Sequence, residues 1–439
     1  MDTKSRNKVK RKKSYYLGFI LIALGILCNK WVLEITIVPD KAIEFFPYVL
    51  LIYVFEVIIL ISGLYLIIRK PDFRIPSKKE LLLVSTGITL IFVMLEVGTR
   101  IWLNFIATPR QRQEYVLYDD LSPEESQWTN HHYLNYYPTP DYKFGLTSHN
   151  SLGFRNKEFS IQKPDGVYRI AVLGGSAAYG LKVEDNGKTF TSQLEILLRD
   201  KHGYNNIEVI NAGVSGYNSW ESLINLEFRV LDVTPDLIIV SPEYDDVHSR
   251  LVSPIAYRGD NIGRRKQWEP PAIRYFERSS LLRVLSRFFG FAGQINLQSF
   301  VSSSTYMGAC SAYDNPGTPE ELMRDMLKKN PPVYFRRNLL NMAAITKMHD
   351  IKTIFTSWAF STSFKDYAAT PHYREGFREN NIIIKEVSNN QNIPFFDFAN
   401  VMSKEKRYWA DGRHINEEGA VLKAELFSDF IHESKLVPR

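Results

Sequence analysis

The sequence has little cysteine and lacks the glycine-rich motifs that bind nucleotides. Only Cys28 and Cys310 occur among 439 residues, far apart in the chain, so neither a disulfide framework nor a cysteine-built zinc site is expected. Neither Gly-x-Gly-x-x-Gly nor Gly-x-x-x-x-Gly-Lys-Ser/Thr is present, which disfavours a nucleotide loop. No metal-ligand constellation and no cofactor motif stands out. The 45% of hydrophobic residues are nevertheless enough to bury a core.

The excess of basic over acidic residues is confined to the N-terminus. The first thirteen residues carry seven lysines and arginines against one aspartate, which accounts for the whole formal net charge of +6. No later stretch interleaves basic and stacking aromatic residues, so we expect no nucleic-acid binding. A basic tail, residues 1–14, directly before an apolar segment is typical of cytoplasmic anchoring.

Three apolar segments follow the tail, at residues 15–28, 45–68 and 81–106. The second and third are long enough to cross a bilayer. The first reaches that length only if it continues to Leu33 and Lys30 extends to the outer interface. Residues 15–107 are therefore predicted to form a three-helix membrane anchor, with the lipid bilayer as partner.

The distribution of basic residues predicts the orientation of this anchor. Five basic residues lie between the second and third segments: Arg69, Lys70, Arg74, Lys78 and Lys79. The loop between the first and second segments has mainly Lys41 and is otherwise acidic. The tail and the second loop are therefore predicted to be cytoplasmic. Everything after residue 107 is then extracytoplasmic, in a periplasm or at a cell surface.

Three ionisable residues interrupt the second and third segments. Glu96 and Arg100 are four residues apart on one helix face, so an ion pair near the outer interface is the favoured interpretation. Glu56 falls near the middle of its segment, where a carboxylate is costly unless protonated or partnered. Contact with another span, or with a membrane protein such as an acyl-donor transporter or a complex subunit, is the functional interpretation.

Beyond an aperiodic connector at residues 108–165, the pattern becomes that of an α/β domain, predicted for residues 166–435. Strand-length apolar runs at 168–173, 207–211, 236–240, 351–356 and 393–398 alternate with helical segments. This pattern predicts a doubly wound, five-stranded parallel sheet of the flavodoxin type. A long insertion at about 248–350, with a helical patch at 281–289, is a candidate lid. Residues 436–439 resemble the remnant of a thrombin-cleaved tag.

The first strand is followed by Gly174, Gly175 and Ser176, a turn that would place the serine hydroxyl at the carboxyl edge of the sheet. Such a serine taken alone is more often a turn residue than a nucleophile. Near the end of the chain, Asp411 and His414 are three residues apart before a helix. The carboxylate of such a pair can orient the imidazole, which can take a proton from a hydroxyl, although a helix-start cap is the simpler interpretation.

These blocks, with the second strand's exit at Gly216 and the third strand's exit at residues 243–246, resemble the SGNH/GDSL hydrolase superfamily. The resemblance covers about residues 140–432 and implies Ser176 as nucleophile, His414 as base and Asp411 as its orienting carboxylate. It also implies Gly216 as an oxyanion donor through its backbone. Two departures stand out: Gly175 occupies the place of the usual aspartate, and Asp245 that of the oxyanion-hole asparagine.

The aspartate is the serious departure, because an ionised carboxylate only accepts hydrogen bonds and repels a developing oxyanion. Protonation of Asp245, favoured by its acidic neighbours Glu243 and Asp246, would restore a donor.

Residues of the insertion are candidates for substrate binding. His248 follows the third strand's exit, and Arg258 and Trp268 belong to a polar and aromatic cluster suited to a sugar. A solvated surface loop explains the same cluster equally well. Two functions remain: a membrane-anchored serine esterase or O-acyltransferase acting on acyl esters of an extracytoplasmic glycan or lipid-linked sugar, and a weakly active or inactive SGNH-like scaffold subunit of a membrane complex.

Overall fold

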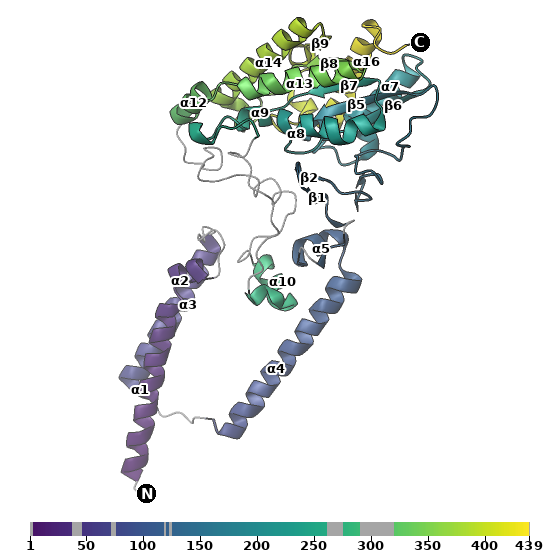
Figure 1. Ribbon diagram of the computed structural model, residues 1–439. Helices are drawn as coiled ribbons and strands as arrows, with labels where there is room; N and C mark the ends of the chain where they lie inside the picture. The colour runs from purple at the N-terminus through teal and green to yellow at the C-terminus, as the bar shows by residue number, and fades with distance from the viewer. Residues whose placement is uncertain are drawn as a thin grey trace. The chain divides into compact units, whose positions relative to one another are not determined.

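The computed structural model describes residues 3–36, 46–71, 76–117, 120–122, 125–260, 275–289 and 320–438. They belong to two compact units. Unit 1 comprises Met1–Leu117 with Ala272–Ile295, and unit 2 comprises Tyr118–Pro271 with Asn296–Arg439. Figure 1 shows unit 1 as separate helices and unit 2 as a sheet between helices.

Unit 1 begins with a close helix pair. Helices α1 (Thr3–Leu27) and α3 (Phe46–Arg69) pack side by side, and the short α2 (Lys30–Thr36) lies between them in the chain. A Cβ atom on Gly18 would lie 2.6 Å from the carbonyl oxygen of Gly63, and one on Gly63 would lie 2.8 Å from that of Gly18. Small residues at such a crossing let two backbones touch, as in packed membrane helices.

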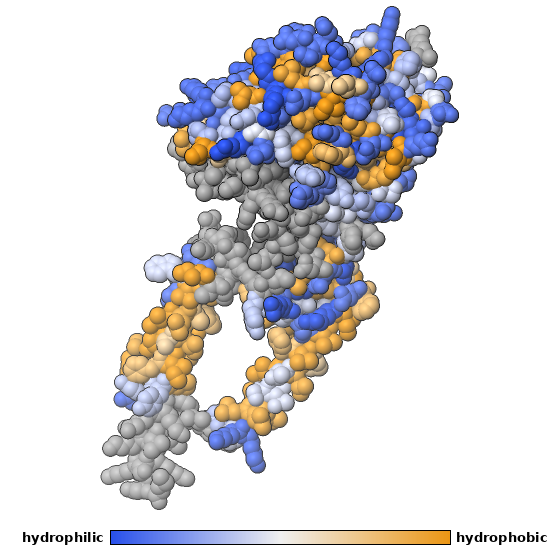
Figure 2. All heavy atoms as spheres, in the orientation of Figure 1, coloured by the Kyte–Doolittle hydropathy of each residue, from blue (hydrophilic) through white to orange (hydrophobic). Residues whose placement is uncertain are grey.

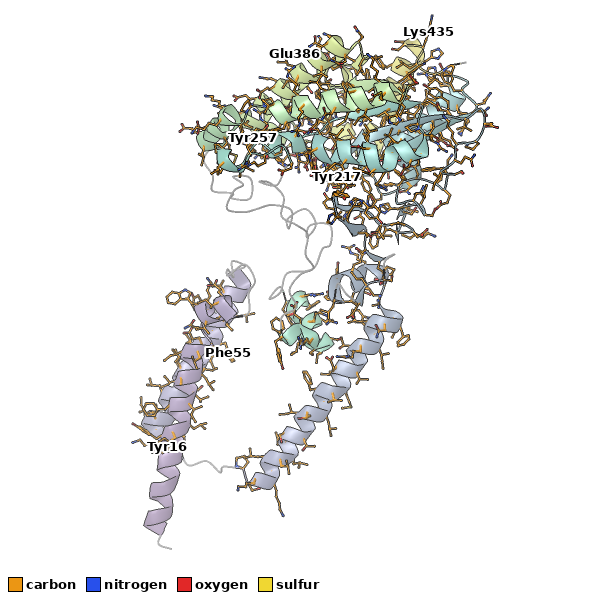
Figure 3. The ribbon with its side chains drawn as sticks, in the orientation of Figure 1. Tyr16, Phe55, Tyr217, Tyr257, Glu386 and Lys435 are labelled. Atoms are coloured by element: carbon orange, nitrogen blue, oxygen red, sulfur yellow. The ribbon has the colours of Figure 1, made fainter. Side chains whose placement is uncertain are left out.

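Two helices of unit 1 are long and apolar enough to cross a membrane, judged by length and composition. One is Val49–Arg69 within α3; the other is Lys78–Ile106, in which α4 (Lys78–Ile101) continues through the π-helical turn Trp102–Ile106. Apolar residues cover both helices (Figure 2), and Phe55 of α3 projects from its helix (Figure 3). The two longer predicted segments therefore form suitable helices.

The first predicted segment does not reach that length among the described residues, so the third predicted span is not confirmed. Its apolar helix, Tyr15–Leu27, is about 20 Å long at 1.5 Å per residue. The helix ends here because the side chain of Asn29 makes hydrogen bonds with backbone groups both before and after it in the chain. Its side chain donates to Ile26 O at 2.8 Å and accepts from Val32 N at 3.0 Å.

The ionisable residues of these helices differ in the contacts they make. The predicted ion pair is confirmed: Arg100 Nε lies 2.7 Å from Glu96 Oε1. Glu56 is half-buried on α3 and makes no hydrogen bond or ion pair with any residue that the structure describes. The suggestion that Glu56 contacts another membrane protein stays a prediction.

Unit 2 is built on a five-stranded parallel sheet. Its strands are β5 (Tyr168–Gly174), β6 (Ile207–Asn211), β7 (Leu237–Ser241), β8 (Lys352–Thr356) and β9 (Phe395–Phe396), in the order β6-β5-β7-β8-β9. This order confirms the predicted doubly wound sheet. The chain reverses direction across the sheet between β6 and β7, so the carboxyl end of β5 is the expected place for a site.

Helices cover both faces of the sheet. Alternate residues of β5 explain why: Ile170 and Val172 face one core, whereas Ala171 and Leu173 face the other. The first core includes α7 (Phe190–Asp200) and α16 (Glu417–Glu433); the second includes α8 (Ser219–Asn225), α13 (Val333–Met348) and α14 (Pro371–Gln391). The sequence predicted a helical segment between the fourth and fifth strands but not the bounds of α14, which is largely polar.

The predicted connector is divided between the two units. Its first part contains α5 (Pro109–Tyr115) of unit 1. Its second part forms two hairpins of unit 2, β1 (Trp128–His131) with β2 (Asn135–Pro138), and β3 (Lys143–Phe144) with β4 (Thr147–Ser148). The buried Arg155 guanidinium then donates to the carbonyl oxygens of Gly180 at 2.7 Å and Val183 at 2.6 Å. This segment therefore supports the loop that follows α6 (Ser176–Tyr179), the short helix after β5.

The insertion between β7 and β8 contains three helices among its described residues besides α13: α9 (Asp245–His248), α10 (Ser280–Phe288) and α12 (Glu320–Lys329). The predicted helical patch corresponds to α10. At the end of the chain, Leu436 and Val437 are buried in the core, and Tyr168 Oη donates to Leu436 O at 2.9 Å. These two residues, which the sequence analysis set aside as a tag remnant, are part of the packed domain.

Candidate active site

The candidate nucleophile stands where the central strand turns into a helix. Ser176 is the first residue of α6 (Ser176–Tyr179), directly after β5, and is 1% exposed. The turn requires glycine at position 175, because a Cβ there would lie 2.8 Å from both Tyr217 O and Glu243 Oε2. Tyr217 lies on the loop leading into α8 (Figure 3). The absence of a side chain at Gly175 thus lets two loops close around Ser176.

Ser176, His414 and Asp411 form a continuous hydrogen-bonded chain. Ser176 Oγ lies 2.7 Å from His414 Nε2, and His414 Nδ1 lies 2.8 Å from Asp411 Oδ2. Asp411 Oδ1 also accepts the backbone N–H groups of Arg413 and His414, each at 2.8 Å. The Asp-x-x-His segment is therefore a tight turn that aims the imidazole at the serine. The sequence prediction brought these three residues together correctly, although their roles stay predictions.

The charge on Asp411 suits an orienting carboxylate. Burial alone would raise the pKa of Asp411, but the hydrogen bond from the His414 ring and two backbone N–H groups hold that pKa well below its usual range. Asp411 thus stays ionised and keeps the proton of a neutral imidazole on Nδ1. His414 Nε2 is then free to accept the proton of Ser176 Oγ.

One backbone donor is available beside the serine hydroxyl. The N–H of Ser176 has no acceptor among the residues that the structure describes. Gly216, the predicted second donor, has a φ of +81° and precedes Tyr217, whose carbonyl oxygen contacts the Gly175 turn. The loop of Gly216 is therefore adjacent to the nucleophile turn. Its role as an oxyanion donor stays a prediction.

Glu243 makes contacts with this turn that no sequence pattern indicated. Glu243 Oε2 accepts the N–H of Ala177 and Oε1 accepts that of Ala178, both at 2.8 Å. Glu243 Oε2 also lies 3.5 Å from Ser176 Oγ. Glu243 therefore caps α6, and it occupies the two N–H groups that follow that of Ser176.

A buried lysine accompanies Glu243. Lys423 of α16 is 2% exposed, and its ammonium lies 4.3 Å from the ring centre of Phe190 and 5.3 Å from that of Phe398. Burial raises the pKa of Glu243, a trend that the Ala177 hydrogen bond opposes. Burial likewise lowers the pKa of Lys423, and the charge of Glu243 opposes this. The two groups are electrostatically linked although they lie 180 residues apart in the chain.

The two aspartates after Glu243 serve other contacts. Asp245 begins α9, is 1% exposed, and lies with Oδ1 3.8 Å from Nδ1 of the buried His248. Asp246 accepts the N–H of Ser219 at 3.0 Å and so supports the start of α8. Burial raises the pKa of Asp246 to about 7. Glu243 contacts the nucleophile turn through its hydrogen bonds to Ala177 and Ala178.

Aromatic residues lie next to the triad. The ring of Tyr244 meets that of His414 edge to face at 6.0 Å between centres, and the Arg413 guanidinium lies 4.6 Å from the Tyr244 ring centre. Trp358 shares a buried apolar cluster with Ala177, the residue after the nucleophile. Its indole N–H is buried and has no acceptor among the described residues. Trp358 thus offers a hydrogen-bond donor that no described residue of the chain uses.

Two of the remaining predicted binding residues, His248 and Arg258, lie in the described part of the chain and differ in exposure. His248 is buried between the rings of Tyr244 and Tyr373, at 4.8 Å and 5.2 Å between centres. Arg258 is exposed and donates to Ile255 O at 3.2 Å. Trp268 lies outside the described residues. Within the described part of the chain, no group of three His, Cys, Asp or Glu residues could hold a metal ion.

Comparison with known proteins gives the following picture. No protein-family model matches the chain, and no curated protein matches it. Among solved structures, a lipase/acylhydrolase from Enterococcus faecalis is 16% identical, with 62% of this chain and 99% of that chain covered and a TM-score of 0.37. A GDSL-like lipase from Bacteroides thetaiotaomicron VPI-5482 is 15% identical, with 61% and 88% covered and a TM-score of 0.34.

An acetyl xylan esterase from Geobacillus stearothermophilus is 14% identical, with 60% and 94% covered and a TM-score of 0.36. At such identities and TM-scores, these likenesses carry no conclusion about activity, substrate or the roles of residues. Those conclusions have to come from the geometry of the site.

Proposed function

We propose that the chain is a membrane-anchored serine ester hydrolase or O-acyltransferase of the SGNH/GDSL type. The observation that carries this proposal is the hydrogen-bonded chain from Ser176 through His414 to Asp411, at 2.7 Å and 2.8 Å. This is the arrangement that activates a serine hydroxyl in many unrelated folds. The position of Ser176 at the carboxyl end of the central strand supports it further.

The proposed reaction proceeds through an acyl-serine. Ser176 Oγ attacks the ester carbonyl carbon while its proton passes to His414 Nε2, and Asp411 stabilises the imidazolium that forms. The N–H of Ser176 donates to the oxyanion. His414 then returns the proton to the departing alcohol. Water or an acceptor hydroxyl repeats these steps in reverse, which gives hydrolysis or acyl transfer respectively.

The membrane anchor and its orientation belong to the same proposal. The helices Val49–Arg69 and Lys78–Ile106 have the length and hydropathy of spans. The basic residues of the tail and of the loop after α3 support a cytoplasmic N-terminus and an extracytoplasmic unit 2. The enzyme would then be a multi-pass protein of the cytoplasmic membrane that works in the periplasm or at the cell surface.

The proposed substrate is an acyl ester of a glycan or lipid-linked sugar. Tyr244, Arg413 and Trp358 support it, because a sugar presents an apolar ring face to an aromatic side chain and hydroxyls to polar groups. The guanidinium of Arg413, which lies against the Tyr244 ring, and the buried indole N–H of Trp358, which has no acceptor among the described residues, are suitable polar groups for sugar hydroxyls.

Covalent labelling tests the proposal. The detergent-purified chain would be treated with a fluorophosphonate, which reacts with activated serines by loss of fluoride, and the adduct would be read by intact mass. We expect one adduct on the unmodified chain and none on Ser176→Ala or His414→Ala. Ser434→Ala, at an exposed serine that follows α16, is the matched control and should label normally.

The outcome also decides between the enzyme and the alternative, a weakly active or inactive scaffold subunit of a membrane complex. Absence of an adduct from a chain whose circular dichroism shows it to be folded would favour the scaffold. An adduct that persists in Ser176→Ala would place the reactive serine elsewhere and overturn the assignment of the nucleophile.

A further inference from the structure

Helix α10 in the insertion is amphipathic with its apolar side outward. Its two arginines, Arg283 and Arg287, are 3% and 2% exposed. Its apolar residues Leu282, Leu285 and Phe288 are 39%, 41% and 68% exposed. On a helix that packs against a water-soluble protein, the apolar stripe faces the protein and the charges face solvent. The reverse arrangement requires an apolar surrounding for the outer face.

The polar side of α10 binds other elements of unit 1. Arg283 Nε donates to Tyr115 O at 2.7 Å, and Arg287 Nη1 donates to Glu114 O at 2.9 Å. Both carbonyl groups belong to α5. These bonds fix the rotation of α10 about its axis, so the outward position of its apolar stripe is set by hydrogen bonds.

Glu96 of α4 binds the start of α10. Its carboxylate accepts the backbone N–H groups of Ser280 at 3.0 Å and Leu281 at 2.9 Å, and the hydroxyl of Ser279 at 2.8 Å. The same carboxylate pairs with Arg100. Glu96 therefore anchors α10 to one point on α4.

That point lies at the depth of a membrane interface. Glu96 is eighteen residues after Lys78, the first residue of α4, which corresponds to about 27 Å along a helix. The hydrocarbon core of a bilayer is about 30 Å thick, so Glu96 reaches its outer edge if Lys78 stands at the inner one. Around it, α4 exposes apolar side chains such as Met94 and Leu95, at 65% and 52%. The apolar stripe of α10 thus belongs to a helix that packs on α4, whose own exposed apolar side chains suit lipid.

We propose that α10 is a lipid-contacting interfacial helix. Its apolar stripe, Leu282, Leu285 and Phe288, enters the outer leaflet of the bilayer, while Glu96 and α5 hold its polar side. This rests on the proposed membrane anchor and goes beyond it, because the insertion that follows the candidate active-site strand β7 becomes attached to the membrane surface. An enzyme tethered in this way would meet amphiphilic esters in the leaflet itself.

Site-specific fluorescence in vesicles tests the proposal. The full-length chain, with Cys28→Ser and Cys310→Ser, would carry one new cysteine with an environment-sensitive fluorophore. It would be reconstituted in phosphatidylcholine and phosphatidylglycerol vesicles containing nitroxide-labelled lipids. The three positions are Leu285→Cys on the α10 stripe, Met94→Cys on α4, and Ile382→Cys, an exposed apolar residue of α14 in unit 2.

We expect lipid nitroxides to quench the probes at 285 and 94 but not the probe at 382. Quenching at 94 without quenching at 285 would overturn the interfacial helix and leave the anchor standing. Quenching at 285 but not at 94 would support α10 and overturn α4 as a span. No quenching at either position would overturn both, whereas fluorophosphonate labelling of Ser176 would be unaffected.

The contact with Glu96 gives a second, independent outcome. In Glu96→Ala, the probe at 285 should lose much of its lipid quenching, since the start of α10 loses three hydrogen bonds to α4. The probe at 94 should keep its quenching. Equal quenching at 285 with and without Glu96 would show that this carboxylate does not hold α10 at the bilayer.

Discussion

Glu243 and Ser176 meet at the start of helix α6, where Glu243 Oε2 lies 3.5 Å from Ser176 Oγ and 2.8 Å from the N–H of Ala177. The carboxyl group of Glu243 thus contacts the backbone of the turn, whereas His414 contacts the hydroxyl of Ser176. Two acids, Glu243 and Asp411, therefore lie on either side of the same serine. Asp411 bonds the ring of His414, and Glu243 holds the backbone of the turn that carries Ser176.

Replacement of Asp411 by asparagine should remove the base's orientation without removing the fold. In Asp411→Asn, the amide would favour the tautomer of His414 that carries its proton on Nε2, which cannot accept the proton of Ser176. We expect the rate of fluorophosphonate labelling to fall on the order of 10³- to 10⁴-fold. The measurement is the time course of adduct formation by intact mass. A fall of less than about tenfold would argue against Asp411 as the orienting group.

Loss of Glu243 should cost both stability and nucleophile position. Glu243→Ala leaves the N–H groups of Ala177 and Ala178 buried without acceptors, at a cost of about 1–3 kcal/mol each. It also leaves Lys423 without its nearby negative charge. We expect a lower unfolding temperature and slower labelling of Ser176.

Lys423 allows a double-mutant test of that link. Glu243→Gln keeps the size of the side chain but leaves the buried charge of Lys423 without a nearby negative charge. Adding Lys423→Met should therefore recover part of the stability lost in Glu243→Gln. Unfolding temperatures of the two single variants and the double variant measure the coupling. Additive effects would mean that the two groups do not interact.

The close approach at Gly175 predicts that a single methyl group is not tolerated. In Gly175→Ala, the new Cβ would lie 2.8 Å from Tyr217 O, a backbone atom that cannot move without its loop. Overpacking of this kind costs about 1–3 kcal/mol. Gly187→Ala is the matched control, because its Cβ would meet only the Asp185 side chain at 3.3 Å. Thermal unfolding of both variants checks this, and equal stability would contradict the contact.

The triad could be predicted from the sequence because each member belongs to a short local pattern. Ser176 follows a strand and two glycines, and Asp411 and His414 stand three apart before a helix. Glu243 and Lys423 have no such pattern, since their relation depends on how β7 and α16 pack around α6. A lone lysine among the apolar residues of α16 looks like a solvated position until the three phenylalanines around it are placed.

The helices show the same limit. The strands could be predicted because buried parallel strands are continuous apolar runs. The bounds of α14 could not, because most of its residues are polar. The length of the first apolar helix could not be predicted from composition, because it depends on the hydrogen bonds by which Asn29 ends this helix. The outward stripe of α10 likewise depends on partners from α4 and α5, which lie about 170–185 residues earlier in the chain.

Asp246 predicts a pH dependence of stability with a definite sign. Its pKa is about 7 in the folded chain against 3.8 for an ordinary aspartate, because burial favours the neutral acid. The folded state therefore binds more protons than the unfolded state between these values, and this group's contribution to stability declines as the pH rises from about 4 to about 7. Asp246→Asn removes the titration while keeping an oxygen that can accept the N–H of Ser219. The unfolding temperature of Asp246→Asn minus that of the unmodified chain should accordingly increase with pH across this range. Scanning fluorimetry at several pH values measures the difference, and a difference that stays constant with pH would show that Asp246 does not titrate there.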